Sequence, residues 1–154
     1  MTTRRGRRLG VDVGDVRIGV AVSDPDGILA TPVETVAAGA GAIPRLAELV
    51  REHEVLECVV GLPTGLSGRE GPAAIKVRAF CDDLLAAIDP VPIRLFDERM
   101  STVTADSMLR QSGRSGKGRR SIIDQAAATV ILQTALDSER TRGSAPGESI
   151  GRQP

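Results

Sequence analysis

The N-terminal third of the chain has the residue pattern of an antiparallel meander. Apolar residues alternate with small or polar ones over 7–13, 17–24 and 28–36, a period of two that is typical of half-buried strands. Short turns are expected at Gly14–Asp15 and at Asp24–Gly27, where turn-forming residues gather. The pattern therefore predicts three consecutive strands joined by tight turns.

The rest of the chain alternates between helical and strand patterns. Apolar positions recur at helical spacing in several segments, whereas two short apolar runs have the length of buried strands. Helices are expected at residues 42–55, 72–88, 101–113 and 121–140, and buried strands at 56–63 and 91–98. Right-handed crossovers place these two strands parallel to the first strand, on its open side. The prediction is an α/β fold with a five-stranded mixed sheet in the order 3-2-1-4-5, flanked by helices.

The length and composition are those of one globular domain. The 154 residues are 41% hydrophobic and 26% charged, which is ordinary for a folded protein with a single core. We assign residues 9–137 to the domain, residues 1–8 to a basic N-terminal tail, and residues 138–154, where the composition turns polar, to a disordered C-terminal tail.

Several classes of protein are disfavoured by what the sequence lacks. There is no tryptophan or tyrosine, so stacking on aromatic side chains is not its main route to single-stranded nucleic acid. No apolar run approaches the roughly 20 residues of a membrane span, and no apolar segment of a secretory signal follows the basic N-terminus. Cys58 and Cys81 lack metal-site spacing and are expected to be buried thiols, with a redox pair as the alternative. We expect a cytoplasmic protein with no membrane partner.

The formal net charge is zero, but the basic residues are clustered. Four arginines lie within residues 4–8, and the segment 110–121 contains five basic residues and no acidic one. Basic residues interleaved with glycine and serine form loops suited to phosphate groups. Taken alone, the segment is equally typical of a solvated flexible loop.

Acidic residues fall at one edge of the predicted sheet. Asp12 shares a strand face with Gly10 and Gly14, opposite the apolar face, and Asp97 and Glu98 end the fifth strand. In such sheets, functional sites gather at the carboxyl ends of strands where the strand order changes direction. A buried unpaired carboxylate costs several kcal/mol, so Asp12 needs a partner.

A further carboxylate is expected from the last helix. Asp124 falls inside the apolar arc of residues 121–140, and Ala126–Ala128 are small enough to let this helix approach the sheet closely. Helix capping is the alternative role, because Ser121 and Asp124 have the spacing of a capping box. Converging carboxylates repel one another and need cations, and His53 is the only histidine. Oxygen ligands without imidazole favour Mg²⁺ or Mn²⁺, which support phosphodiester hydrolysis.

Four motifs, in order, resemble one bacterial family. They are "GVDVGDVRIGVAVSD", "VVGLPTGLSG", "FDERMST" and "IIDQAAATVILQ", and they span residue 9 to about residue 136. The chain is therefore identified as a member of the YqgF (RuvX) family of RNase H-like, Holliday-junction-resolvase-like proteins. The resemblance implies an RNase H-like fold and a metal-dependent nuclease that processes the 5′ end of precursor 16S rRNA. It also leaves open a role on branched DNA. A four-way junction has two-fold symmetry, so a homodimer would suit such a substrate.

The resemblance also implies roles for particular residues. Asp12, Glu98 and Asp124 match the acids that would bind the metal ions and carry catalysis, whereas Asp97 would instead orient Arg99 or a backbone amide. The expected contacts to the nucleic acid fall at Arg17, Arg99, Thr102, Lys117, Arg119 and Arg120.

Two other interpretations remain. An ATP-binding domain of the actin and sugar-kinase class also opens on a DxG turn, but it needs two such domains, and the chain has length for one. The stronger rival is a non-catalytic RNase H-like module that binds rRNA or a protein. The acidic trio argues against this rival, because a pure binding module would gain by losing buried like charges.

Overall fold

The computed structural model describes residues 4–64, 68–100 and 116–151, and within its last helix it describes side chains from Asp124 onward. The strands are β1 (Arg8–Val13), β2 (Arg17–Ser23), β3 (Ala30–Ala37), β4 (Glu57–Leu62), β5 (Ile93–Asp97) and β6 (Glu148–Ile150). The helices are α1 (Ala42–His53), α2 (Pro72–Ile88), the short 3₁₀ helix η1 (Glu98–Met100) and α4 (Gly116–Arg142). The helix expected at 101–113 lies outside the described residues.

The strands form one mixed sheet in the order β3-β2-β1-β4-β5-β6. β1, β2 and β3 pair antiparallel as the meander, and β4 and β5 run parallel to β1. This confirms the predicted order 3-2-1-4-5. The carboxyl ends of β1, β4 and β5 therefore lie at the same edge of the sheet.

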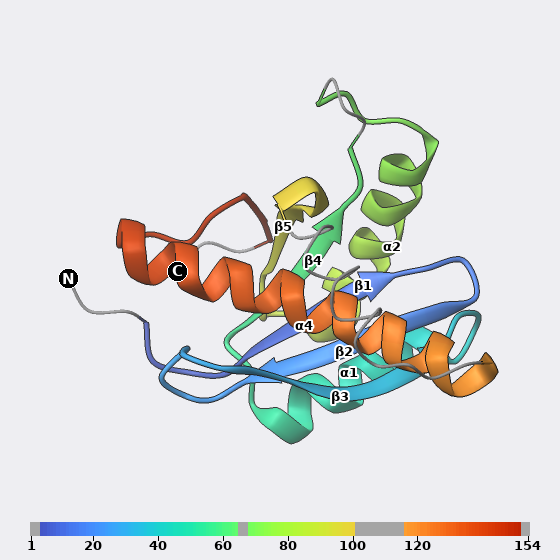
Figure 1. Cartoon of the computed structure of the whole chain (residues 1–154), viewed down its shortest axis with the longest axis horizontal. Coiled ribbons are helices and arrows are strands. Elements are labelled where there is room, and N and C mark those ends of the chain that lie inside the picture. Colours follow the sequence, from blue (N-terminus) through green and yellow to red (C-terminus); the bar gives the residue numbers. More distant parts are fainter. Residues whose placement is uncertain (1–3, 65–67, 101–115, 152–154) are drawn as a thin grey trace.

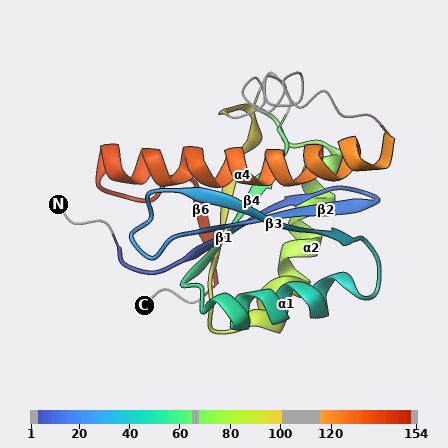
Figure 2. The same ribbon diagram turned by 60° about the horizontal axis from the view of Figure 1, so that its bottom comes forward.

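Helices cover both faces of the sheet. Figure 2 shows α4 on one face and α1 with α2 on the other, and Figure 1 shows α4 running obliquely across the strands. Leu9 and Val11 of β1 point toward α1 and α2 in the larger apolar cluster. Ala128 and Leu132 of α4 pack in a second cluster on the opposite face. The alternation seen in the first strand thus separates two cores.

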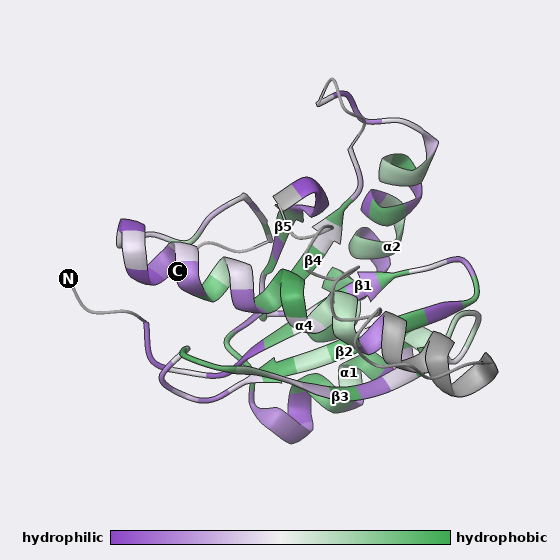
Figure 3. Cartoon of the chain, in the orientation of Figure 1, coloured by the Kyte–Doolittle hydropathy of each residue, from purple (hydrophilic) through white to green (hydrophobic). Residues whose placement is uncertain are grey.

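Apolar side chains concentrate in the layers between sheet and helices. Figure 3 shows hydrophobic residues along the central strands and hydrophilic ones at the exposed ends of the helices. Even α4, the longest helix, does not have the length of unbroken apolar sequence that would cross a membrane, and neither does any other helix among the described residues.

The structure differs from the sequence-based expectation after residue 138. Helix α4 continues to Arg142, and β6 adds a sixth strand, pairing antiparallel with β5 through Ile93 and Ile150. Because β6 has only three residues and joins the sheet at an edge, its sequence carries too little alternation to be recognised. The segment expected to be disordered therefore carries secondary structure.

The start of α4 also differs from the expectation. The helix begins at Gly116 rather than at Ser121, so part of the basic segment expected to be a loop has a helical backbone. Ser121 lies inside the helix, and Asp124 is more than two turns from its first residue. The capping-box role that was the alternative for Asp124 is therefore wrong.

Candidate functional site

Two carboxyl groups meet at the carboxyl edge of the parallel strands. Asp12 is the fifth residue of β1, and Glu98 directly follows β5 as the first residue of η1. β4 lies between these strands, and its Gly61 leaves room for the Glu98 side chain. A Cβ atom on Gly61 would lie only 2.7 Å from Glu98 Oε1. The glycine therefore allows two carboxyl groups from different strands to meet.

Asp12 and Glu98 share a hydrogen bond, and both are partly buried. Burial, followed by the hydrogen bond and negative charge of Asp12, raises the pKa of Glu98 to about 8. Burial also raises the pKa of Asp12, and the negative charge of Asp124 adds to this effect. Because two carboxylates cannot hydrogen-bond without a proton, the raised pKa makes Glu98 the protonated partner, and its O–H donates a hydrogen bond to the Asp12 carboxylate. The proton is the partner that Asp12 requires.

Asp124 reaches the same region from α4. The helix crosses β2 so closely that a Cβ atom on Gly19 would lie 1.8 Å from the backbone oxygen of Asp124. Gly19 is also the strand partner of Asp12. The bare backbone at Gly19 therefore fixes Asp124 beside the carboxyl pair, close enough for its charge to raise the pKa of Asp12.

The side chain of Asp124 is paired with an arginine. Arg17, the first residue of β2, donates from Nε to Asp124 Oδ2 at 2.9 Å. Among the described residues, no group of three acidic or metal-binding side chains is arranged to hold a metal ion. The structure thus brings the three predicted acids into one region, with two of them in direct contact and the third bound to Arg17.

Asp97, the last residue of β5, holds Arg99. Its carboxylate accepts hydrogen bonds from the backbone N–H and guanidinium of Arg99 and from the Thr64 hydroxyl at 3.0 Å. Side-chain hydrogen bonding by Arg99 outweighs burial and lowers the pKa of Asp97. The expectation that Asp97 orients Arg99 or a backbone amide is confirmed, because its carboxylate accepts hydrogen bonds from both.

The carboxyl pair opens into a cleft of about 320 Å³. Its other walls are the turn after β1 and the first turns of α2, with Asp15 and Lys76 facing each other at 3.7 Å. Sequence reasoning missed Lys76. The signal that could have found it is its place near the start of the crossover helix after β4, because such a helix begins at the carboxyl edge of the sheet.

The remaining sequence-predicted contacts are not described in full. Thr102 lies outside the described residues. Lys117, Arg119 and Arg120 lie in the first two turns of α4, where only the backbone is described. Both cysteines are buried and free, as expected, and burial raises the pKa of each thiol.

A family model described as "RuvX: Holliday junction resolvase" matches residues 6–138 of the chain. A protein of Streptomyces avermitilis named "Putative pre-16S rRNA nuclease" is 62% identical over 97% of both chains. Proteins with the same name from Nocardioides sp. and Thermobifida fusca are 59% and 54% identical, each over 96% of this chain and 97% of the relative.

The overall fold is also similar to a solved structure. The chain matches Thermus thermophilus RuvC in complex with a Holliday junction substrate with a TM-score of 0.61, at 18% identity, over 93% of this chain and 99% of that one. At this identity the likeness concerns the fold alone, and it confirms the predicted RNase H-like architecture.

Proposed function

Since the chain belongs to the RuvX family, we propose that it is a nuclease that hydrolyses phosphodiester bonds in structured nucleic acid, with precursor 16S rRNA as its substrate. The observation that carries this proposal is the hydrogen-bonded carboxyl pair of Asp12 and Glu98 at the mouth of a cleft. Close relatives named for pre-16S rRNA support the choice of substrate. An rRNA substrate would place the activity in the cytoplasm.

The chemistry of the site fits a divalent metal ion, and we propose Mg²⁺ or Mn²⁺. All of its donors are carboxylate oxygens, the ligands that these hard cations prefer. Protonation of Glu98 removes one of the two negative charges of the carboxyl pair, and a bound cation would neutralise the same two groups in its place. When bound, such an ion supplies an activated water and stabilises the leaving oxygen in phosphodiester hydrolysis.

The chain's own residues divide into ligands and phosphate contacts. Asp12, Glu98 and Asp124 are the proposed metal ligands and catalytic residues. The proposed phosphate contacts are Arg17, Arg99, Thr102, Lys117, Arg119 and Arg120. In support, Arg99 is held in place by Asp97 next to Glu98, so its guanidinium is already oriented when the nucleic acid arrives.

A four-way DNA junction is the second candidate substrate, favoured by the description of the matching family model. A junction has two-fold symmetry, so this activity would call for a homodimer. A non-catalytic binding module is the third alternative, and it requires binding without cutting.

One experiment separates these candidates. The purified chain is incubated with a 5′ precursor fragment of 16S rRNA and with a four-way DNA junction, each in Mg²⁺, Mn²⁺ or EDTA. We expect cutting of the RNA in metal and none in EDTA, and no cutting by Asp12→Asn, whose folding is checked by circular dichroism. Cutting of the junction alone would reassign the substrate. Binding without cutting of either substrate, or equal cutting by folded Asp12→Asn, would refute the proposal.

A further inference from the structure

Asp124 is the acid of the site that a cationic side chain already neutralises. Arg17 Nε donates to Asp124 Oδ2 at 2.9 Å, and the two side chains are 35% and 19% exposed. The pair joins the first residue of β2 to the first third of α4, 107 positions apart in the sequence. The backbone of Asp124 lies directly against Gly19 of the same strand as Arg17, which brings the two side chains within reach of each other.

The guanidinium of Arg17 is only partly used. Among the described residues it has one hydrogen-bond partner, through Nε, so its terminal nitrogens keep their N–H groups for another acceptor. A guanidinium presents a planar fork that matches a phosphate group in two parallel hydrogen bonds. Since about a third of the side chain is exposed, a phosphate group can reach it from solvent.

A metal ion and Arg17 compete for the same carboxylate. Gly19 is the strand partner of Asp12 and lies against the backbone of Asp124, so an ion held by these two acids would be close to the Arg17 contact. Two cations at one carboxylate repel each other, and the repulsion is strong in a partly buried site. If the Arg17 guanidinium left Asp124 and bound a phosphate group instead, this repulsion would be relieved.

We propose that Arg17 is a positioning residue that occupies Asp124 in the free protein and transfers to a phosphate group of the nucleic acid. This inference rests on the proposed function. The consequence is that nucleic acid and divalent ion bind with positive cooperativity, since each removes an obstacle to the other. The site then assembles all three acids only when a substrate is present.

The first test measures Mn²⁺ binding to the free protein by titration calorimetry. We expect Arg17→Gln to bind Mn²⁺ at least fivefold more tightly than the wild type, because Asp124 is released. Lys76→Gln is the control, since it removes a cation that lines the same cleft and pairs with Asp15 rather than with the proposed ligands. A gain of less than fivefold for Arg17→Gln, or an equal gain for Lys76→Gln, overturns the inference.

The same titration distinguishes failure of the inference from failure of the proposed function. If Asp12→Asn abolishes Mn²⁺ binding while Arg17→Gln leaves it unchanged, the metal site stands and only the inference is wrong. If neither the wild type nor Arg17→Gln binds Mn²⁺, both are wrong.

The second test measures the reciprocal effect in EDTA, where no cutting occurs. Binding of a 20-base-pair RNA duplex is compared for the wild type, Asp124→Asn, and the double variant with Arg17→Gln. We expect Asp124→Asn to bind at least fivefold more tightly because Arg17 is released, and the double variant to lose this gain. Asp15→Asn controls for the loss of one negative charge at the cleft. An equal gain in Asp15→Asn, or a gain that persists in the double variant, overturns the inference.

Discussion

Asp12 and Glu98 show how two acidic side chains can share a partly buried position. A single ionised carboxylate there would lack the solvation that water provides, and two would repel each other as well. The raised pKa of Glu98 resolves this with one proton, which stays on Glu98 and is shared with Asp12 through a hydrogen bond. The same pair is the centre of the proposed metal site, so the metal-free protein carries a proton where the active protein is expected to carry a cation.

The proton on Glu98 predicts a stability that depends on pH. In the unfolded chain a glutamate ionises near pH 4.3, whereas the pKa of Glu98 in the folded protein is raised to about 8. Between these values the folded state holds a proton that the unfolded state has lost, so the free energy of unfolding falls as the pH rises. In EDTA, we expect this fall between pH 5 and 8 in the wild type and its loss in Glu98→Gln, measured by urea denaturation.

An exposed glutamate provides the control for this measurement. The hydrogen bond to Arg78 lowers the pKa of Glu70, so this carboxyl group loses its proton at a lower pH than Glu98 does. Glu70→Gln should therefore follow the wild type in parallel from pH 5 to 8. If the free energy of unfolding of Glu98→Gln also changed with pH in parallel with the wild type, the proton shared by Asp12 and Glu98 would be contradicted.

At the scale of the elements, the position of α4 is set by glycines in the strands beneath it. Gly19 of β2 meets the backbone of Asp124, and a Cβ atom on Gly10 of β1 would lie 2.7 Å from Leu132 Cβ. The polar stripe of α4 runs over the edge strand, where Gln133 accepts from the backbone N–H of Ala30 at 2.8 Å. These contacts fix both the depth and the rotation of the helix that carries Asp124.

A side chain at Gly19 should displace the helix. We expect Gly19→Ala to lower the free energy of unfolding by about 1–3 kcal/mol, because its methyl group would overlap the Asp124 backbone. Gly41 is the matched control, since it has a φ of −85° and no atom within 4 Å of an added Cβ. Gly41→Ala should change the stability by no more than about 0.5 kcal/mol. Thermal and urea unfolding measure both variants, and equal effects would contradict the close approach.

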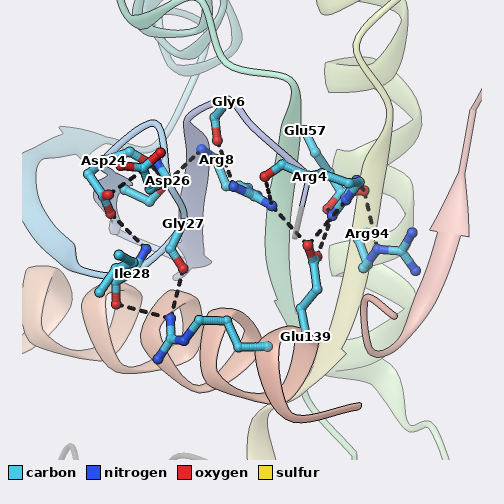
Figure 4. A network of polar contacts seen from close by, with 12 residues as sticks. Arg4, Gly6, Arg8, Asp24, Asp26, Gly27, Ile28, Glu57, Arg94 and Glu139 are labelled. Atoms are coloured by element: carbon cyan, nitrogen blue, oxygen red, sulfur yellow. Dashed lines mark hydrogen bonds and ion pairs between the residues drawn. The ribbon is translucent and has the colours of Figure 1, made fainter. Parts of the chain in front are cut away.

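At the scale of the whole molecule, the sheet carries charged groups at both ends. Opposite the carboxyl edge, Glu57 and Glu139 are buried among three arginines, as Figure 4 shows. Arg8, only 1% exposed, donates to Glu139 at 2.9 Å, and Arg4 bridges Glu139 and Glu57. Arg94 completes the network by donating to Glu57 at 3.2 Å. The network ties the N-terminal residues to the end of α4 and to β4 and β5.

Removal of one buried charge should strongly destabilise the fold. We expect Glu139→Gln to lower the free energy of unfolding by about 3–5 kcal/mol, because Arg8 would stay buried without its anionic partner. Asp137→Asn is the control on the same helix, where an exposed carboxylate pairs with Arg140 and should contribute no more than about 1 kcal/mol. Urea unfolding at pH 7 measures both, and similar small effects would contradict a structural role for the network.

The same network predicts how stability changes in acid. Burial opposes ionisation of Glu139, but hydrogen bonds and the charges of Arg4 and Arg8 outweigh it and lower the pKa of Glu139. The stability that this carboxylate contributes is present at neutral pH and is lost as the pH falls through its lowered pKa. The difference in the free energy of unfolding between the wild type and Glu139→Gln should therefore become smaller below about pH 4.

The sequence predicted those features that depend on local pattern. Alternation in β1 placed Asp12 opposite the apolar face, and the family resemblance implied the contact between Asp97 and Arg99. Pairings between distant positions were missed, because neither residue marks the other in the sequence. Arg8 was assigned to a basic tail, although Glu57 and Glu139 allow its burial, and nothing near Arg17 pointed to Asp124. β6 was missed because three residues are too few to show the alternation of apolar and polar positions that marks a strand.

The proposed metal site is tested most directly by a crystal of the protein grown in Mn²⁺ and measured for anomalous scattering. We predict an anomalous peak between Asp12 and Glu98, with an oxygen of each carboxylate coordinated to the ion and the hydrogen bond between them broken. If saturating Mn²⁺ gives no peak there, and the carboxyl groups of Asp12 and Glu98 stay within hydrogen-bond distance of each other, the proposed metal site is contradicted.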